Sequence, residues 1–297
     1  DCENCILQPP IFADIVKIFR KFIIKNGITV YDSEKHTGLL RHIYLRLAEA
    51  TGEVMVCAVI NGEDLPHKNE LIEKLTEIPS VKSIVLNINR DRTNVILGKE
   101  CVTVWGNDCI YDVLCGVKVR LSPLSFYQVN HDMAQQLYEK AAEYACLSGK
   151  ETVLDMYCGT GTIGLSMEKK AKRIIGAEIV PEAVLDAKRN ALENGIENAE
   201  FICADAGEAA QELSSRGIKP DVVLLDPPRK GCSEMLLAEI VKMSPERIVY
   251  VSCDPSTLAR DCFRLKDLGY ETKRLAAADL FPRTVHVESV ALLTKQK

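Results

Sequence analysis

Cys253 occupies the position in this sequence that most directly suggests covalent chemistry. It follows the apolar run Ile248-Val249-Tyr250-Val251 and precedes a predicted helix with Pro255 in its first turn. The positive end of a helix favours a thiolate and lowers the pKa of a thiol below its free value of about 8.5. The position predicts a nucleophile at the rim of a cleft. The alternative is an ordinary thiol that fills the core.

The segment LLDPPRKG (224–231) ends another apolar strand at Asp226. Its two prolines enforce an extended loop without backbone donors, which leaves the Asp226 carboxylate and nearby carbonyls available as acceptors. In methyltransferases such Asp-Pro-Pro segments hold planar nitrogen-containing groups; the alternative is a rigid loop that caps the next helix. Ligands of open α/β sheets bind at the carboxyl ends of the strands, so we expect Asp226 and Cys253 at the same cleft.

Glu288 lies in an apolar strand-like run that follows Phe281-Pro282 near the end of the chain. A carboxylate in such surroundings costs free energy unless it has a partner or a chemical task. The alternative is a glutamate on an edge strand that faces solvent.

The stretch VLDMYCGTGTIGL (153–165) predicts a nucleotide site. Gly159, Gly161 and Gly164 follow a predicted strand in G-x-G-x-x-G register, which permits a sharp turn and close approach of a ligand to a helix N-terminus. Glu178 ends the next predicted strand, where it can accept hydrogen bonds from ribose hydroxyls.

Two further aspartates bear on which nucleotide binds. Asp155 ends the first strand and can interact with the charged amino-acid end of adenosylmethionine, which NAD lacks. Asp205, in CADA (203–206), follows the third strand and suits an adenine amino group. The order and spacing favour adenosylmethionine, with NAD as the alternative.

The elements that position these residues fall into two patterns. From about residue 126, apolar strands alternate with amphipathic helices, which predicts a doubly wound, Rossmann-like α/β domain with a parallel sheet. The first half shows strands at 39–48 and 54–60, a helix at 67–78 and further strands joined by polar turns, which predicts a smaller, largely antiparallel α+β domain. We expect domains at 1–124 and 125–297.

Composition sets the class of protein. The 297 residues are 47% hydrophobic and carry a net charge of −5, which argues against a strongly basic nucleic-acid binder without excluding RNA. Twelve cysteines in a chain of this length predict mainly reduced thiols rather than a disulfide framework. No apolar run approaches the roughly 20 residues of a membrane span, so we expect a cytoplasmic protein.

Taken together, these segments resemble the RNA uracil-5-methyltransferases, which form 5-methyluridine in ribosomal and transfer RNA. The matching pieces run in family order: SFYQVN (125–130), LDMYCGTGTIGL, AEIVPEAV, LDPPRKG, VSCDPSTLARD and FPRTVHVES. The resemblance implies a class I methyltransferase domain in which Cys253 is the nucleophile and Glu288 the general base. It implies that six residues bind adenosylmethionine: Gln128, Tyr157, Thr162, Glu178, Asp205 and Asp226.

The first residues extend the resemblance. Many family members bind a [4Fe–4S] cluster on four cysteines, and Cys5 in CILQPP matches the last of these ligands. Cys2 and Cys5 are too few for a cluster, and the family's N-terminal β-barrel has no counterpart. We therefore expect an N-terminally truncated enzyme, with a cluster in the full-length protein alone. The ENCILQP segment favours the 23S ribosomal RNA branch over the transfer RNA branch.

The leading hypothesis is methylation of uridine C5 in RNA, through a covalent adduct between Cys253 and uracil C6. We expect RNA as partner, no membrane, no DNA and a monomer, with His42, Tyr44, Arg46 and Arg120 on an RNA-facing surface of the first domain. The alternatives are a transfer RNA uracil-5-methyltransferase, an amino methyltransferase that uses Asp226 without covalent catalysis, and a non-enzymatic RNA-binding scaffold.

Overall fold

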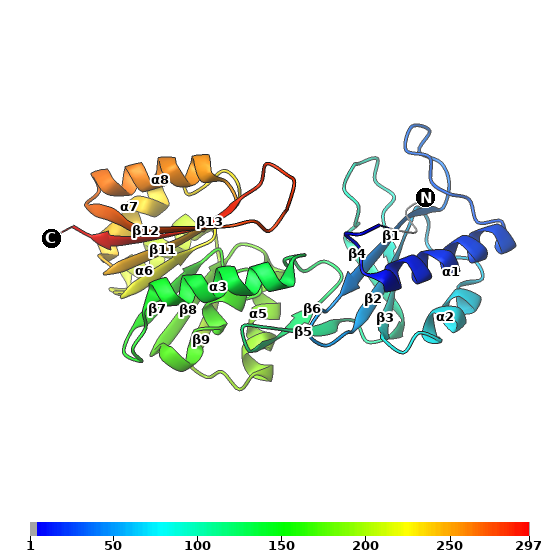
Figure 1. The fold of residues 1–297 in the computed structure, drawn as a ribbon, viewed down its shortest axis with the longest axis horizontal. Helices are drawn as coiled ribbons and strands as arrows, with labels where there is room; N and C mark the ends of the chain where they lie inside the picture. Colours follow the sequence, from blue (N-terminus) through cyan, green and yellow to red (C-terminus); the bar gives the residue numbers. More distant parts are fainter. Residues whose placement is uncertain (1–4, 297) are drawn as a thin grey trace. The chain divides into compact units, whose positions relative to one another are not determined.

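The computed structural model describes residues 5–296 and divides into two compact units (Figure 1). Unit 1 comprises residues up to Val113 together with Arg120–Ser125, and unit 2 comprises Leu114–Val119 together with residues from Phe126 on. The division passes through a hairpin of β5 (Ile110–Leu114) and β6 (Val117–Leu121). Cys115 and Gly116 turn this hairpin with φ of 51° and 79°, as a two-residue type I′ turn requires.

Unit 1 is a four-stranded sheet with two helices. Its elements are α1 (Pro10–Asn26), β1 (Leu40–Leu47), β2 (Val54–Ile60), α2 (Lys68–Thr76), β3 (Val81–Ile88) and β4 (Glu100–Gly106). The strands lie in the order β1-β2-β3-β4. β2 and β3 are parallel because α2 connects them as a crossover, whereas the other two pairs are antiparallel, as predicted for most of this sheet.

The core of unit 1 lies between the helices and one face of the sheet. Phe19 of α1 and Leu75 of α2 are fully buried against strand residues such as Val56 and Ile60. The 3.6-residue spacing of the apolar side chains therefore decides which face of each helix packs on the sheet.

Unit 2 contains a seven-stranded sheet flanked by helices. Its strands are β7 (Thr152–Met156), β8 (Arg173–Glu178), β9 (Ala199–Cys203), β10 (Val222–Leu225), β11 (Arg247–Ser252), β12 (Tyr270–Ala278) and β13 (Glu288–Lys295). Its helices are α3 (His131–Ala145), α4 (Thr162–Leu165), α5 (Pro181–Glu193), α6 (Ala206–Ser215), α7 (Glu234–Met243) and α8 (Pro255–Asp267). The expected Rossmann-like domain is confirmed.

The strand order β12-β13-β11-β10-β7-β8-β9 reverses at β7, which creates the switch point where ligands of such sheets bind. β13 runs antiparallel to both of its neighbours, so the sheet is mixed and not wholly parallel as predicted. The segment between β12 and β13 is too short for a helical crossover, and this forces the chain to return in the opposite direction.

Helices cover both faces of the larger sheet (Figure 1). Side chains of α6, α7 and α8 share one buried cluster with alternate strand residues, including Leu154, Val223 and Tyr250. α3 and α5 bury Leu137 and Val184 outside that cluster, on the opposite face.

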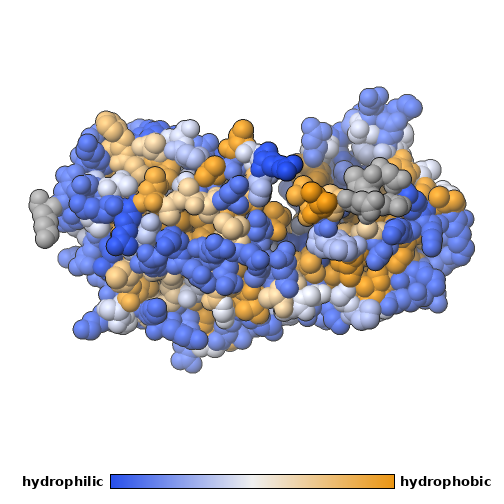
Figure 2. All heavy atoms as spheres, in the orientation of Figure 1, coloured by the Kyte–Doolittle hydropathy of each residue, from blue (hydrophilic) through white to orange (hydrophobic). Residues whose placement is uncertain are grey.

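Figure 2 shows, on one face of the molecule, hydrophobic side chains in patches separated by hydrophilic ones. Within residues 5–296, no helix combines the length and the apolar character that a bilayer crossing needs.

Candidate functional site

The glycine-rich loop between β7 and α4 is held open at the carboxyl edge of the larger sheet. Tyr157, Gly159 and Gly161 have φ of 65°, 54° and 81°, which turns the chain sharply between strand and helix. A Cβ added to Gly159 would meet no atom within 4 Å, so open space borders the loop there. The predicted helix after this loop is short: α4 ends at Leu165, and a single 3₁₀ turn follows at Glu168–Lys170.

Glu178 binds backbone amides on the outer side of this loop. Its Oε2 accepts a hydrogen bond of 3.1 Å from the Gly159 amide, and its Oε1 accepts one of 2.9 Å from the Val180 amide. The side chain stays partly exposed at the end of β8. The predicted ribose acceptor thus lies beside the glycine loop and also shapes it.

Buried polar side chains form hydrogen bonds with the backbone of this loop on its inner side. Asp155 accepts a hydrogen bond of 3.0 Å from the Gly164 amide, and burial, together with the charge of Glu178, raises its pKa to about 7. We expected Asp155 to face the cofactor, whereas its carboxylate is buried under the loop. Asn190 of α5, which the sequence analysis missed, donates a hydrogen bond of 3.0 Å to the Thr160 carbonyl.

Three other predicted cofactor residues lie around this edge. Thr162 is buried, with its hydroxyl 3.1 Å from that of Thr160. Tyr157 is half-buried against the core beneath α6 and α7. Asp205 is exposed at the start of α6, where its Oδ1 accepts a hydrogen bond of 2.8 Å from the Gly207 amide. Asp205 is therefore an N-cap and remains accessible to a ligand.

Cys253 and Glu288 come together through the pairing of β11 with β13. Their ladder ends with Ser252 opposite Ser289. Cys253 directly follows Ser252 and Glu288 directly precedes Ser289, so the two side chains lie near each other, and the charge of Glu288 acts on the Cys253 thiol. Glu288 is 5% exposed and lies on an internal strand. It is therefore not a solvent-facing residue of an edge strand.

The electrostatics of this pair differ from the expectation. The pKa of Cys253 is raised, first by burial and then by the carboxylates of Glu288 and Asp226. The expectation that the helix N-terminus lowers this pKa is not met in the protein without ligand, because burial and two nearby carboxylates oppose a thiolate. Burial also raises the pKa of Glu288, and the guanidinium of Arg229 partly offsets this.

Asp226 and Arg229 belong to the loop after β10, residues 226–232, which we call the rim loop. Burial raises the pKa of Asp226 to about 8, and the charges of Glu288 and Asp155 contribute. The Arg229 guanidinium lies 3.5 Å from the His286 ring. Hydrogen bonds from the Thr257 and Ser256 amides lower the pKa of Asp254, and the charge of Arg229 adds to this effect. The rim loop therefore adds one acid and one cation to the pair Cys253–Glu288.

Gln128 lies beside these groups through contacts of α3. The Tyr138 hydroxyl is buried and forms a hydrogen bond with the Gln128 side chain. Burial and the charges of Asp226 and Glu288 raise its pKa. Tyr138 was not among the predicted site residues, because its helical spacing resembles that of any core residue. Gln128 is partly exposed, so a ligand can reach it.

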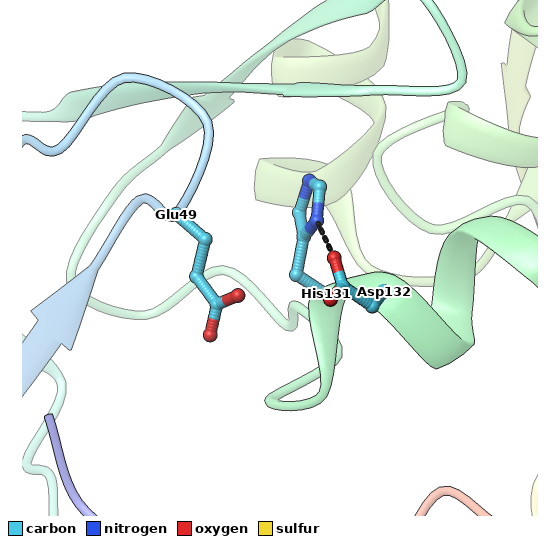
Figure 3. Close-up of side chains that lie close together, drawn as sticks. All are labelled: Glu49, His131 and Asp132. Atoms are coloured by element: carbon cyan, nitrogen blue, oxygen red, sulfur yellow. Dashed lines mark ion pairs between the residues drawn. The ribbon is translucent and has the colours of Figure 1, made fainter.

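The start of α3 fixes the segment that carries Gln128. Asn130 caps the helix by accepting a hydrogen bond of 3.2 Å from the Met133 amide, and it donates one of 3.1 Å to the Leu280 carbonyl. His131 and Asp132 follow, with 3.5 Å between the His131 ring nitrogen and the Asp132 carboxylate (Figure 3). The Asn130 bond ties the segment 125–130 to the loop that precedes Glu288.

Cys5 is the expected iron–sulfur ligand. Cys5 is partly exposed, and Cys2 lies outside the described residues. Within residues 5–296, no group of three or more potential ligands contains Cys5. The described residues therefore do not make a cluster site.

The structure also changes the predicted RNA-facing surface of unit 1. Arg46 is buried and donates hydrogen bonds of 2.6 and 2.7 Å to the carbonyls of Ser122 and Ser125. Arg120 is buried and pairs with Asp108 at 2.6 Å. These two arginines stabilise unit 1 internally, which leaves His42 and Tyr44 of the four predicted residues on the accessible surface.

Comparison with known proteins gives concordant results. The family model described as tRNA (Uracil-5-)-methyltransferase matches residues 115–296. The chain is 48% identical, over 295 residues, to an uncharacterized RNA methyltransferase of Clostridium tetani, covering 99% of this chain and 64% of the relative. An uncharacterized RNA methyltransferase of Halalkalibacterium halodurans is 48% identical over 294 residues, with the same coverage. The chain thus spans less than two thirds of the length of these relatives.

A solved structure is similar over almost the whole chain. The tRNA (uracil-54, C5)-methyltransferase of Pyrococcus abyssi, in complex with S-adenosyl-L-homocysteine, superposes with a TM-score of 0.81 and 32% identity. The match covers 95% of this chain and 67% of that protein.

Proposed function

The chain belongs to the tRNA (uracil-5-)-methyltransferase family, and on that premise we propose that it methylates C5 of a uridine in RNA with adenosylmethionine as methyl donor. The observation that carries the proposal is the antiparallel pairing of β11 with β13, which brings Cys253 and Glu288 near each other and near the Asp226 carboxyl. A nucleophile, a base and an acceptor for a ring N–H are the three groups that this reaction needs.

The residues around the glycine loop fit adenosylmethionine. The open space beside Gly159, the partly exposed Glu178 and the exposed Asp205 offer a surface for an adenosyl group and two carboxylate acceptors. Gln128, Tyr157 and Asp226 border the same edge, while Thr162 supports the loop from within. Bound adenosylmethionine supplies an electrophilic methyl group.

Cys253 starts the chemistry. Its thiolate adds to C6 of the uracil ring, a C–S bond forms, and the C5–C6 double bond becomes an enolate with electron density at C5. C5 is then nucleophilic enough to take the methyl group. Asp226 orients the ring as an acceptor for the uracil N3–H, and its raised pKa indicates a site poised for a proton or a cation.

Glu288 completes the reaction. After methylation, C5 carries both a methyl group and a hydrogen, and the aromatic ring returns when the C5 proton leaves and the C6–S bond breaks. Glu288 takes that proton, and the electron pair re-forms the double bond while Cys253 departs as thiolate. A buried base with a raised pKa is suited to accept a proton near neutral pH.

We propose ribosomal RNA as the first substrate to test, on the basis of the ENCILQP segment around Cys5. The Pyrococcus abyssi enzyme, which acts on uracil 54 of transfer RNA, supports transfer RNA as the second candidate. In either case the target base must leave its stack to reach Cys253, at a cost of a few kcal/mol that is smallest in loops.

The test is release of tritium from RNA labelled at uracil C5, since methylation at that carbon expels its hydrogen. The full-length protein should release tritium in the presence of adenosylmethionine, and Cys253→Ala should abolish release. Cys262→Ala on α8, the helix that follows Cys253, should retain it. Glu288→Gln should still form the covalent adduct but release tritium at least 100-fold more slowly, as expected for loss of a general base.

Each alternative gives a different pattern. Amino methylation transfers the methyl group to RNA without tritium release and survives Cys253→Ala. A scaffold binds RNA without either reaction. Failure of the full-length wild type to release tritium from both ribosomal and transfer RNA would contradict the proposal.

A further inference from the structure

Asp261 of α8 is a fully buried carboxylate that takes no part in the proposed chemistry. Its Oδ2 accepts hydrogen bonds of 2.7 Å from the Tyr250 hydroxyl and 2.8 Å from the Cys232 amide. Its Oδ1 accepts bonds of 2.9 Å from Arg260 and 3.3 Å from Arg264. A carboxylate can remain buried in this way because charged and neutral donors replace its water.

The rim loop depends on this carboxylate. Cys232 is its last residue, and Arg260, held by Asp261, donates a second bond of 2.8 Å to the Lys230 carbonyl. Gly231 has φ of 73°, and a Cβ there would lie 2.5 Å from the Asp261 carboxylate and 2.4 Å from the Arg260 guanidinium. The rim loop therefore packs directly on the Asp261–Arg260 pair, at a distance that glycine alone permits.

Asp261 is also joined to the strand that delivers the nucleophile. Tyr250 lies on β11 three residues before Cys253, and α8, which carries Asp261, begins two residues after Cys253. The same carboxylate thus binds the segments on both sides of Cys253 and the loop that carries Asp226 and Arg229. Its bonds therefore connect the rim loop to the strand and the helix that flank Cys253.

We propose that Asp261 is a positioning residue that fixes the rim loop relative to Cys253, an inference that rests on the function proposed above. Without its bonds the rim loop moves, and a bound base reaches the sulfur in a reactive orientation less often. Such a loss of alignment lowers kcat more than it changes KM.

The experiment compares two variants that disturb the contact from opposite sides. Asp261→Asn removes one acceptor oxygen on α8, and Gly231→Ala pushes the rim loop away from the pair. Glu234→Gln is the matched control, because it breaks the exposed ion pair of 2.7 Å to Arg264 without touching the rim loop. The measurements on the full-length protein are kcat and KM for tritium release, the affinity for adenosylmethionine and amide hydrogen exchange of residues 229–232.

We expect kcat to fall at least tenfold in both variants while KM for RNA changes less than about threefold, with faster exchange in the rim loop and no change in the control. An unaltered kcat and unaltered exchange in Asp261→Asn overturns the proposal. If Asp261→Asn does not fold, Gly231→Ala decides, and a parallel loss of kcat, RNA affinity and thermal stability there also overturns it. An inactive wild type contradicts the proposed function alone, since the exchange of residues 229–232 still tests Asp261.

Discussion

At the scale of single residues, Cys253 and Glu288 form an electrostatically coupled pair. Burial and then the charge of Glu288 raise the pKa of Cys253, and burial raises the pKa of Glu288. The Arg229 guanidinium lowers both pKa values and so partly opposes these shifts.

Glu288→Gln should lower the pKa of Cys253. The amide removes a negative charge that opposes the thiolate, while the burial of the thiol stays the same. The midpoint of the pH profile for alkylation of Cys253 by iodoacetamide, followed by peptide mass spectrometry, should move to lower pH. Glu271→Gln, an exposed change on β12, serves as the control. A profile that does not move would show that the two groups are uncoupled.

Asp226 should make the ligand-free protein less stable as pH rises. Its folded pKa of about 8 exceeds its ordinary value of 3.8, so between these values the folded state binds more protons than the unfolded state, and the free energy of unfolding falls with increasing pH. Asp226→Asn should therefore stabilise the protein at pH 8 by about 1 kcal/mol or more, roughly 2–4 °C in Tm for a domain of this size.

The difference between Asp226→Asn and wild type should shrink as the pH falls from 8 towards 3.8, because the folded state stays protonated there and the unfolded state gradually takes up the same proton. Thermal melts at pH 5 and pH 8, with the exposed Asp267→Asn on α8 as control, measure it. An equal effect at both pH values would contradict the shifted pKa.

At the scale of elements, the glycine loop is held by partners that come from other elements. Asp155 of β7 and Asn190 of α5 bind its backbone from below, and Glu178 of β8 binds it from the outer side. Side chains from two strands and one helix thus hold the backbone of this loop, and its other side remains open to a ligand.

Asn190→Ala should weaken this support. The Thr160 carbonyl loses a buried donor, which costs about 1–3 kcal/mol of stability, and the glycine loop becomes free to shift. We expect a lower Tm and at least a fivefold weaker affinity for adenosylmethionine, measured by calorimetry, whereas exposed Lys188→Ala on the same helix changes neither. An unchanged affinity with a lowered Tm would limit Asn190 to a role in stability.

At the scale of the molecule, each unit has a core of its own. Unit 1 packs α1 and α2 on its sheet, and unit 2 packs α6, α7 and α8 on one face of the larger sheet. The family match of 115–296 coincides closely with unit 2, and Asn194 ties the Lys118 backbone to this unit with bonds of 2.9 and 2.7 Å. The residues proposed to act on cofactor and base all belong to unit 2.

A chain that begins at Leu114 should therefore fold and bind adenosylmethionine with an affinity within about threefold of the 297-residue chain, since it retains every residue proposed for that site. Its methylation of RNA should be much weaker if unit 1 contributes to RNA binding. Calorimetry with adenosylmethionine and tritium release from RNA separate the two effects. An unfolded product would show that unit 2 depends on unit 1.

The sequence by itself determined the two patterns of strands and helices, the glycine loop and the identity of Cys253, Asp226 and Glu288 as residues of interest. Those signals are local: they depend on the spacing of apolar side chains and on the backbone preferences of glycine and proline within a few residues. The same signals also place residues at the ends of strands, where parallel sheets expose them.

Tertiary structure alone decided what depends on contacts between distant segments. Reversal of β13 sets Glu288 against Cys253, and no local pattern encodes the direction in which a strand enters a sheet. Burial beside two carboxylates raised the pKa of Cys253, where the helix start had suggested the opposite. Arg46 and Arg120 are buried, and Asp261 binds three segments. The free energy of a buried charge depends on hydrogen-bond partners that the fold brings from elsewhere in the chain.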